Sequence, residues 1–291
     1  MMRGILLKGY GGFYYVHTED QLWECSLRGR FRLKSQEFLA GDRVWISPGL
    51  GKTATIEKVE PRKNSLTRPP IANVDQALIV FALVSPEPDY NLLDRLLLQI
   101  ELENIQPVLV LTKTDSWQAT EAEEKHWQAY REMGYSLIKV SNKTGEGIAE
   151  VGKCLEGKTS VMAGPSGVGK SSLLNSLSPG LERKTSEVGK KLKRGRHTTR
   201  HVELMPCAGG FVADTPGFSN LNIPPLRREE LAGYFQDFQR FLGKCRFNSC
   251  LHDREPDCMI KEAVTDGKII GSRYRHYLSF LQEIMENERK Y

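Results

Sequence analysis

A glycine-rich stretch past the middle of the chain has the residue types and spacing of a phosphate-binding loop. Its residues are Gly164, Pro165, Ser166, Gly167, Val168, Gly169, Lys170, Ser171 and Ser172. They fit G-x-x-x-x-G-K-[ST] between an apolar run and a helix-like segment, which is the context that the motif requires. Such glycines let backbone N–H groups close on phosphates at the positive end of a helix. We expect Lys170 to reach the outer phosphates and Ser171 to bind Mg²⁺.

A second motif lies upstream, where an apolar run ends on Thr112, Lys113, Thr114 and Asp115. These residues differ by one from N-K-x-D, which reads guanine in GTPases. The Asp115 carboxylate can accept from the ring N–H and the amine of guanine, whereas adenine would leave it unpaired at a cost of about 1–3 kcal/mol. The aliphatic stem of Lys113 would lie along the base. Thr112 replaces the usual asparagine, so we expect guanine selectivity with weaker affinity.

The next apolar run also ends on a polar loop that suits a nucleotide. Ser141 and Asn142 occupy the place where GTPases back the guanine with a second contact rich in backbone groups. Taken alone, T-K-x-D is a weak motif, and a solvated loop is the alternative. The second loop strengthens the interpretation because both loops follow strands of one expected sheet.

A switch region follows the phosphate loop. The run GGFVADTPG ends in D-x-x-G, from Asp214 to Gly217, and either Thr198 or Thr199 can complete the shell of Mg²⁺ beside Ser171. Phe218 stands where GTPases carry the glutamine that orients water, so we expect slow intrinsic hydrolysis unless a partner helps. His197 and His201 are candidates for positioning the water by proximity alone, against a surface or structural role.

All the elements of a GTPase are present, but the base-reading loop precedes the phosphate loop. A site depends on spatial position, so joining the ends of a domain and reopening it elsewhere preserves the chemistry. We therefore interpret the central region as a circularly permuted GTPase, whose switch leads directly into the C-terminal region. Two alternative functions stay open. The run GPSGVGKSS also suits a nucleotide kinase, and the chain could be an RNA-binding module in which GTP only fixes the conformation.

Four potential metal ligands cluster near the C-terminus: Cys245, Cys250, His252 and Cys258, spaced C-x4-C-x-H-x5-C. Thiolates and an imidazole suit one closed, tetrahedral structural Zn²⁺ per chain, which would help a polar segment to fold. Free thiols or a disulfide are the alternatives, although a cytosolic setting disfavours the bridge.

The elements that would position these groups fall into three regions. Residues 1–68 alternate apolar and polar side chains between turns, which predicts a small barrel of the oligonucleotide-binding (OB) type. Residues 69–222 begin within the linker RPPIANVD, and after that linker they alternate apolar runs with helical segments, which predicts an α/β domain with a parallel sheet covered on both faces. Residues 223–291 predict a mainly helical domain that carries the zinc site.

Charge and composition limit the partners. The 291 residues are 40% hydrophobic with a net charge of +5, an ordinary globular balance that permits a nucleic-acid partner. No apolar run approaches the roughly 20 residues of a membrane span, and we expect a cytoplasmic monomer. Two basic clusters could meet RNA. One is an expected strand with Arg28, Arg30, Arg32 and Lys34 on one face, and the other is Lys190, Lys191, Lys193, Arg194, Arg196 and Arg200.

Together these features resemble one family, the ribosome small-subunit-dependent GTPase A (RsgA) proteins of bacteria. The resemblance covers essentially the whole chain, through NVDQALIV, GPSGVGKSSL, GRHTT, DTPGF and the zinc loop. It implies an RNA-binding barrel, Mg²⁺-dependent hydrolysis of GTP to GDP stimulated by the small ribosomal subunit and its rRNA, a structural zinc domain, and a role in late maturation of that subunit. Thr112 is the chief departure from the pattern.

Overall fold

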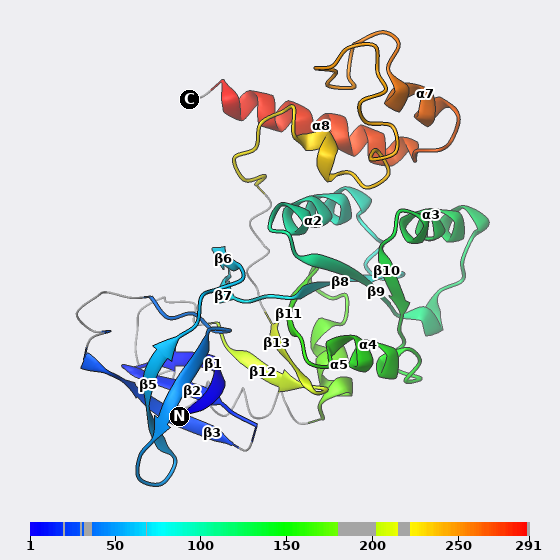
Figure 1. Ribbon diagram of the computed structural model, residues 1–291. Coiled ribbons are helices and arrows are strands. Elements are labelled where there is room, and N and C mark those ends of the chain that lie inside the picture. The colour runs from blue at the N-terminus through cyan, green and yellow to red at the C-terminus, as the bar shows by residue number, and fades with distance from the viewer. Residues whose placement is uncertain are drawn as a thin grey trace.

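The computed structural model describes residues 1–19, 21–29, 31, 37–67, 69–179, 202–214 and 222–289. Figure 1 shows a barrel at the N-terminal end, a central sheet with helices on both faces, and a helical C-terminal part that lies over α2. This three-part architecture confirms the expected fold class.

The N-terminal barrel is closed, with strand order β1-β2-β3-β5-β4. Its strands are β1 (Met2–Tyr10), β2 (Phe13–His17), β3 (Leu22–Leu27), β4 (Arg43–Pro48) and β5 (Thr53–Val59). Alternate residues of each strand point inward, as period-2 patterning requires, and fill the interior with Leu6, Val16, Cys25, Val44, Ile46 and Ile56. The five strands leave no open edge, which confirms the OB-like barrel expected from the sequence.

The prediction of a basic strand from Arg28 onward is wrong at the described positions. β3 ends at Leu27, and the backbone at Gly29 and Phe31 is helical, with Phe31 N–H donating to Arg28 O at 2.9 Å. Phe31 is buried in the barrel core against Phe38. A local turn, closed by this backbone hydrogen bond, replaces the expected strand, and Arg30, Arg32 and Lys34 lie outside the described residues.

The segment expected as a linker contains a small hairpin. β6 (Ser65–Thr67) pairs antiparallel with β7 (Pro70–Ala72), and Ala40 bridges to Ile71. Pro70 is the first residue of β7, a position where a missing N–H is tolerated. The proposed domain boundary after residue 68 stays a prediction.

The central sheet has the order β10-β9-β8-β11-β13-β12. Its strands are β8 (Gln76–Ala82), β9 (Gln106–Thr112), β10 (Ser136–Lys139), β11 (Thr159–Ala163), β12 (Leu204–Cys207) and β13 (Gly210–Asp214). All pairs are parallel except β12 with β13, so the edge departs from the expected all-parallel sheet. The parallel strands bring their carboxyl ends to one edge of the sheet, where α/β folds bind ligands.

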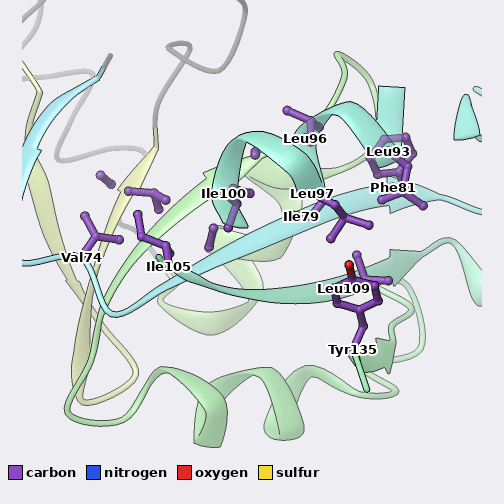
Figure 2. Packing of buried hydrophobic residues seen from close by; sticks show 14 of the residues in the cluster. Val74, Ile79, Phe81, Leu93, Leu96, Leu97, Ile100, Ile105, Leu109 and Tyr135 are labelled. Carbon is purple, nitrogen blue, oxygen red and sulfur yellow. The ribbon is translucent and has the colours of Figure 1, made fainter. Parts of the chain in front are cut away.

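Helices cover both faces of this sheet. They are α2 (Tyr90–Leu102), α3 (Glu121–Glu132), α4 (Ile148–Leu155) and α5 (Lys170–Leu177). Every residue of β8 is buried, and its alternate side chains enter two cores: Ile79 and Phe81 pack with α2 and α3, whereas Leu78 and Val80 pack with α4 and α5. Figure 2 shows the first core, where Leu93, Leu97 and Ile100 of α2 lie over the sheet. This packing fixes the strand ends that carry the site.

The C-terminal part contains α7 (Met259–Thr265), α8 (Gly271–Glu288) and a short 3-10 turn at Leu231–Tyr234. Another 3-10 turn lies in the central region, at Thr114–Ser116. Among the residues described after Asp214, there is no strand, as the sequence predicts. Arg273 of α8 is buried and pairs with Asp94 of α2 and with Asp237 at 2.9 Å. None of the described helices is long and apolar enough to cross a membrane.

Candidate nucleotide-binding site

The phosphate loop is shaped by glycines between β11 and α5. Gly164 has φ +135° and Gly169 has φ +95°, conformations that side-chain-bearing residues rarely adopt. A methyl group at Gly164 would lie only 2.1 Å from the Val80 carbonyl oxygen of β8, so the loop passes directly over the central strand. Lys170 Nζ donates to the carbonyls of Gly164 at 2.8 Å and Pro165 at 2.7 Å, which places its ammonium inside the loop.

Lys113 connects the base-reading loop to the phosphate loop. Its φ of +63° turns the chain sharply after β9. Its Nζ donates to the Gly167 carbonyl at 3.0 Å and also to the Ser85 carbonyl, which follows β8. The lysine stem therefore spans the space between loops that are more than fifty residues apart in sequence. Ser85 was missed from the sequence because a backbone carbonyl leaves no residue-type signal.

Thr112 makes a second connection between the same loops. Its side chain is fully buried, and its hydroxyl lies 2.5 Å from the Val168 carbonyl oxygen and 3.3 Å from that of Phe81. A buried hydroxyl that donates to a loop carbonyl holds that loop in place. Thr112 thus contacts the phosphate loop although its side chain is shorter than the asparagine of the usual motif.

Asp115 is exposed at the edge of the site and is oriented by Ser141. The Ser141 hydroxyl donates to Asp115 Oδ1 at 2.7 Å, and Ser116 donates to Oδ2 at 3.0 Å. These hydrogen bonds, led by that from Ser141, lower the pKa of Asp115. Ser141 itself is buried and accepts from the N–H groups of Lys143 and Thr144. The two polar loops predicted from the sequence are therefore in direct contact.

Two further residues of the predicted loops have partners beyond the sequence motifs. Thr114 Oγ1 donates to Glu146 at 3.2 Å, and Asn142 Oδ1 accepts from Ser176 of α5 at 3.4 Å. Asn142 therefore contacts the helix after the phosphate loop, whereas Ser141 contacts the base-reading Asp115.

The switch half of the site is only partly described. β13 ends at Asp214, in register with Met162 of β11, so its backbone lies beside the strand that feeds the phosphate loop. Ser171 and Ser172 lie exposed in the first turn of α5. The remaining predicted switch residues lie outside the described residues: His197, Thr198, Thr199, His201, Gly217, Phe218 and the basic cluster 190–200.

A separate cluster brings together the four residues predicted to bind zinc. One ligand atom from each of Cys245, Cys250, His252 and Cys258 lies within 4.8 Å of the others. His252 Nδ1 is 3.5 Å from Cys245 Sγ and 3.4 Å from Cys258 Sγ, and those two sulfurs are 4.0 Å apart. Three soft sulfurs and one imidazole nitrogen at these separations fit the tetrahedral donor set of Zn²⁺.

The cluster is partly buried and is held in place by side chains of α8. Burial raises the pKa of the Cys250 thiol to about 12 and raises that of Cys258. Two tyrosine hydroxyls of α8 donate to backbone carbonyls of the loop. Tyr274 donates to that of His252 at 2.7 Å and Tyr277 to that of Leu251 at 2.8 Å.

Comparison with known proteins agrees with this geometry. The model of the RsgA GTPase domain matches residues 59–224, and that of the RsgA N-terminal domain matches residues 3–56. A protein of Moorella thermoacetica named small ribosomal subunit biogenesis GTPase RsgA is 50% identical over the full length of both chains. This chain belongs to the RsgA GTPase family. An RsgA of Shouchella clausii is 45% identical, also over the full length of both.

Two solved structures share the fold. The crystal structure of YloQ, described as a circularly permuted GTPase, is 39% identical with a TM-score of 0.82, covering 99% of this chain and 96% of that one. YjeQ from Thermotoga maritima is 38% identical with a TM-score of 0.82, covering 98% of each. The chain is a circularly permuted GTPase, as its motif order predicts.

Proposed function

We propose that this chain hydrolyses GTP as an assembly factor of the small ribosomal subunit. The observation that carries the proposal is the direct connection of the base-reading loop to the phosphate loop, made by Lys113 with Gly167 and by Thr112 with Val168. These contacts hold Asp115 at a fixed distance from the phosphate loop, so one nucleotide can engage both.

Each residue near the nucleotide has a proposed task. Asp115 accepts from the guanine edge, and the Lys113 stem lies against the base. Backbone N–H groups from Gly164 to Ser172 surround the phosphates, and Lys170 places its charge on the outer ones. Bound Mg²⁺ would offset phosphate charge, held by Ser171 and Thr199. Asp214 would support the metal through water, and the N–H of Gly217 would contact the outermost phosphate.

The partner follows from the relatives and from the predicted switch. The two relatives above are named small ribosomal subunit biogenesis GTPases. Since Phe218 cannot orient water, we propose that the small subunit and its rRNA organise the switch and accelerate hydrolysis. The chain would then work as a cytoplasmic monomer that binds GTP, releases GDP, and contacts rRNA through its barrel and basic residues.

We also propose the metal and domain assignments. One structural Zn²⁺ per chain would be held by Cys245, Cys250, His252 and Cys258 because these are the donors that the C-terminal cluster presents. The chain would divide into a barrel at 1–68, the GTPase domain at 69–222 and the zinc-binding helical domain at 223–291.

The test is phosphate release from GTP and from ATP, each with and without purified small ribosomal subunits. We expect turnover of GTP and not of ATP. Small subunits should accelerate this turnover about tenfold or more. Lys170→Ala should abolish it because the positive charge on the outer phosphates is lost. ADP formation from ATP that depends on GMP would favour the kinase alternative. Turnover that is indifferent to subunits would contradict the proposed partner.

A further inference from the structure

Two polar side chains from different loops converge on Gly169, the residue before the phosphate-binding lysine. A methyl group placed at Gly169 would lie 3.3 Å from Asn142 Nδ2 and 3.9 Å from Thr112 Oγ1. Gly169 is the N-cap of α5, and its carbonyl accepts from Leu173 N–H at 2.9 Å. Whatever holds Gly169 therefore also fixes the start of the helix that carries Lys170.

Asn142 and its neighbour Ser141 face different parts of the site. The Ser141 hydroxyl contacts the Asp115 carboxylate at 2.7 Å, on the base-reading side. The Asn142 carboxamide oxygen lies 3.4 Å from the Ser176 hydroxyl, which also donates to the Ser172 carbonyl at 3.0 Å, and the carboxamide nitrogen packs against Gly169. Asn142 is thus placed between the base loop and the phosphate loop, beside Thr112.

The chemistry of Thr112 explains why a second group is needed there. A threonine hydroxyl has one hydrogen to donate, and that of Thr112 is directed to the Val168 carbonyl. A carboxamide offers two donors and one acceptor, so an asparagine at position 112 could hold the loop at more than one point. Since Thr112 lacks these groups, the space beside Gly169 is filled from the neighbouring loop.

We propose that Asn142 is a positioning residue for the phosphate loop and supplies from the next loop the carboxamide that Thr112 lacks. This inference rests on the proposed nucleotide-binding function. Asn142 holds Gly169 and the first turn of α5 in the geometry that receives phosphate, while Ser141 and Asp115 determine which base is accepted. Affinity for phosphate and choice of base are therefore separable in this site.

The experiment compares Asn142→Ala, Thr112→Asn and the double variant by titration with ribose-labelled fluorescent GDP, GTP and ADP. We expect Asn142→Ala to weaken GDP and GTP binding about tenfold, which corresponds to about 1.4 kcal/mol, without changing the ratio of GDP to ADP affinity. Thr112→Asn alone should stay within about twofold of the original chain. The double variant should regain most of the lost affinity because the carboxamide is restored at position 112.

Two controls keep the test specific. Asn287→Ala makes the same chemical change at an exposed position of α8 and should leave all affinities unchanged. Ser176→Ala removes the helix-side contact to Asn142 together with the bond to the Ser172 carbonyl, and should weaken GDP binding about two- to threefold even if Asn142→Ala folds poorly. Thermal unfolding of each variant without nucleotide separates loss of fold from loss of positioning.

Three results would overturn the inference: unchanged GDP affinity in Asn142→Ala, a double variant as weak as Asn142→Ala, or a loss of GDP-over-ADP preference in Asn142→Ala. An Asp115→Asn variant separates this failure from failure of the proposed function. If Asp115→Asn leaves the preference for guanine intact, the proposed function itself is wrong. If it abolishes that preference while Asn142→Ala is silent, only the positioning role is wrong.

Discussion

At the scale of single residues, buried polar side chains connect segments that are distant in the sequence. Thr112 is fully buried yet satisfied by a loop carbonyl, and Asp94 is buried with three donors around it. Tyr130 donates to Asp94 at 2.8 Å, His276 Nδ1 lies 2.6 Å away, and Arg273 completes the set. These residues come from α2, α3 and α8. A single carboxylate thus joins the C-terminal part to the helices over the sheet.

Removing Arg273 should be costly. Arg273→Met leaves the carboxylates of Asp94 and Asp237 buried without their counter-charge, and breaking a buried ion pair in this way costs about 3–5 kcal/mol. Denaturant unfolding followed by intrinsic fluorescence measures the loss. Arg228→Met is the control because Arg228 pairs with Glu288 at the surface, where the change should be within about 1 kcal/mol. Equal midpoints for the two variants would contradict this account of the cluster.

At the scale of elements, residues 245–258 combine the Cys/His cluster with packing against the C-terminal core, which Cys258 enters and which Cys245, Cys250 and Leu251 contact. Residues 245–258 form no helix or strand, and their polar backbone is held by the cysteine cluster and by Tyr274 and Tyr277 of α8. The proposed Zn²⁺ would add folding free energy to this segment.

Removal of the metal should therefore unfold this loop and leave the nucleotide site intact. A strong chelator should release one Zn²⁺ per chain, detected with a colorimetric indicator, and expose the loop to limited proteolysis. Cys258→Ser should purify without stoichiometric metal, whereas Cys154→Ser, outside the cluster, should retain it. Full metal content in Cys258→Ser would show that this cluster is not the zinc site.

The elements also show what sequence patterns can and cannot predict. Glycine spacing, strand-end loops and the cysteine cluster were predictable because each depends on local chemistry. The helical turn at Phe31 was not, since alternating side chains do not distinguish a strand from a short turn that buries the same ring. Neither were Asp94 and Arg273, 179 residues apart, because long-range pairing leaves no local pattern. The edge strand β12, which pairs antiparallel with β13, was not predicted either because its sequence has no long apolar run.

At the scale of the whole molecule, the central region contacts both the barrel and the C-terminal part. Lys8 of the barrel pairs with Glu203, just before β12, at 2.7 Å. Gln99 of α2 donates to the Asn222 carbonyl at 3.1 Å, where the described chain resumes before the C-terminal part.

The central claim is that Asp115, upstream in the chain, reads the base of a nucleotide whose phosphates are held downstream from Gly164 to Ser172. The most direct measurement is GTP and XTP turnover by Asp115→Asn. Xanthine carries an oxygen where guanine carries its amine, and the new carboxamide can donate to it. We predict that the variant loses GTP turnover and gains XTP turnover. An unchanged preference for GTP would contradict the account, because base and phosphates would then not be held by one permuted site.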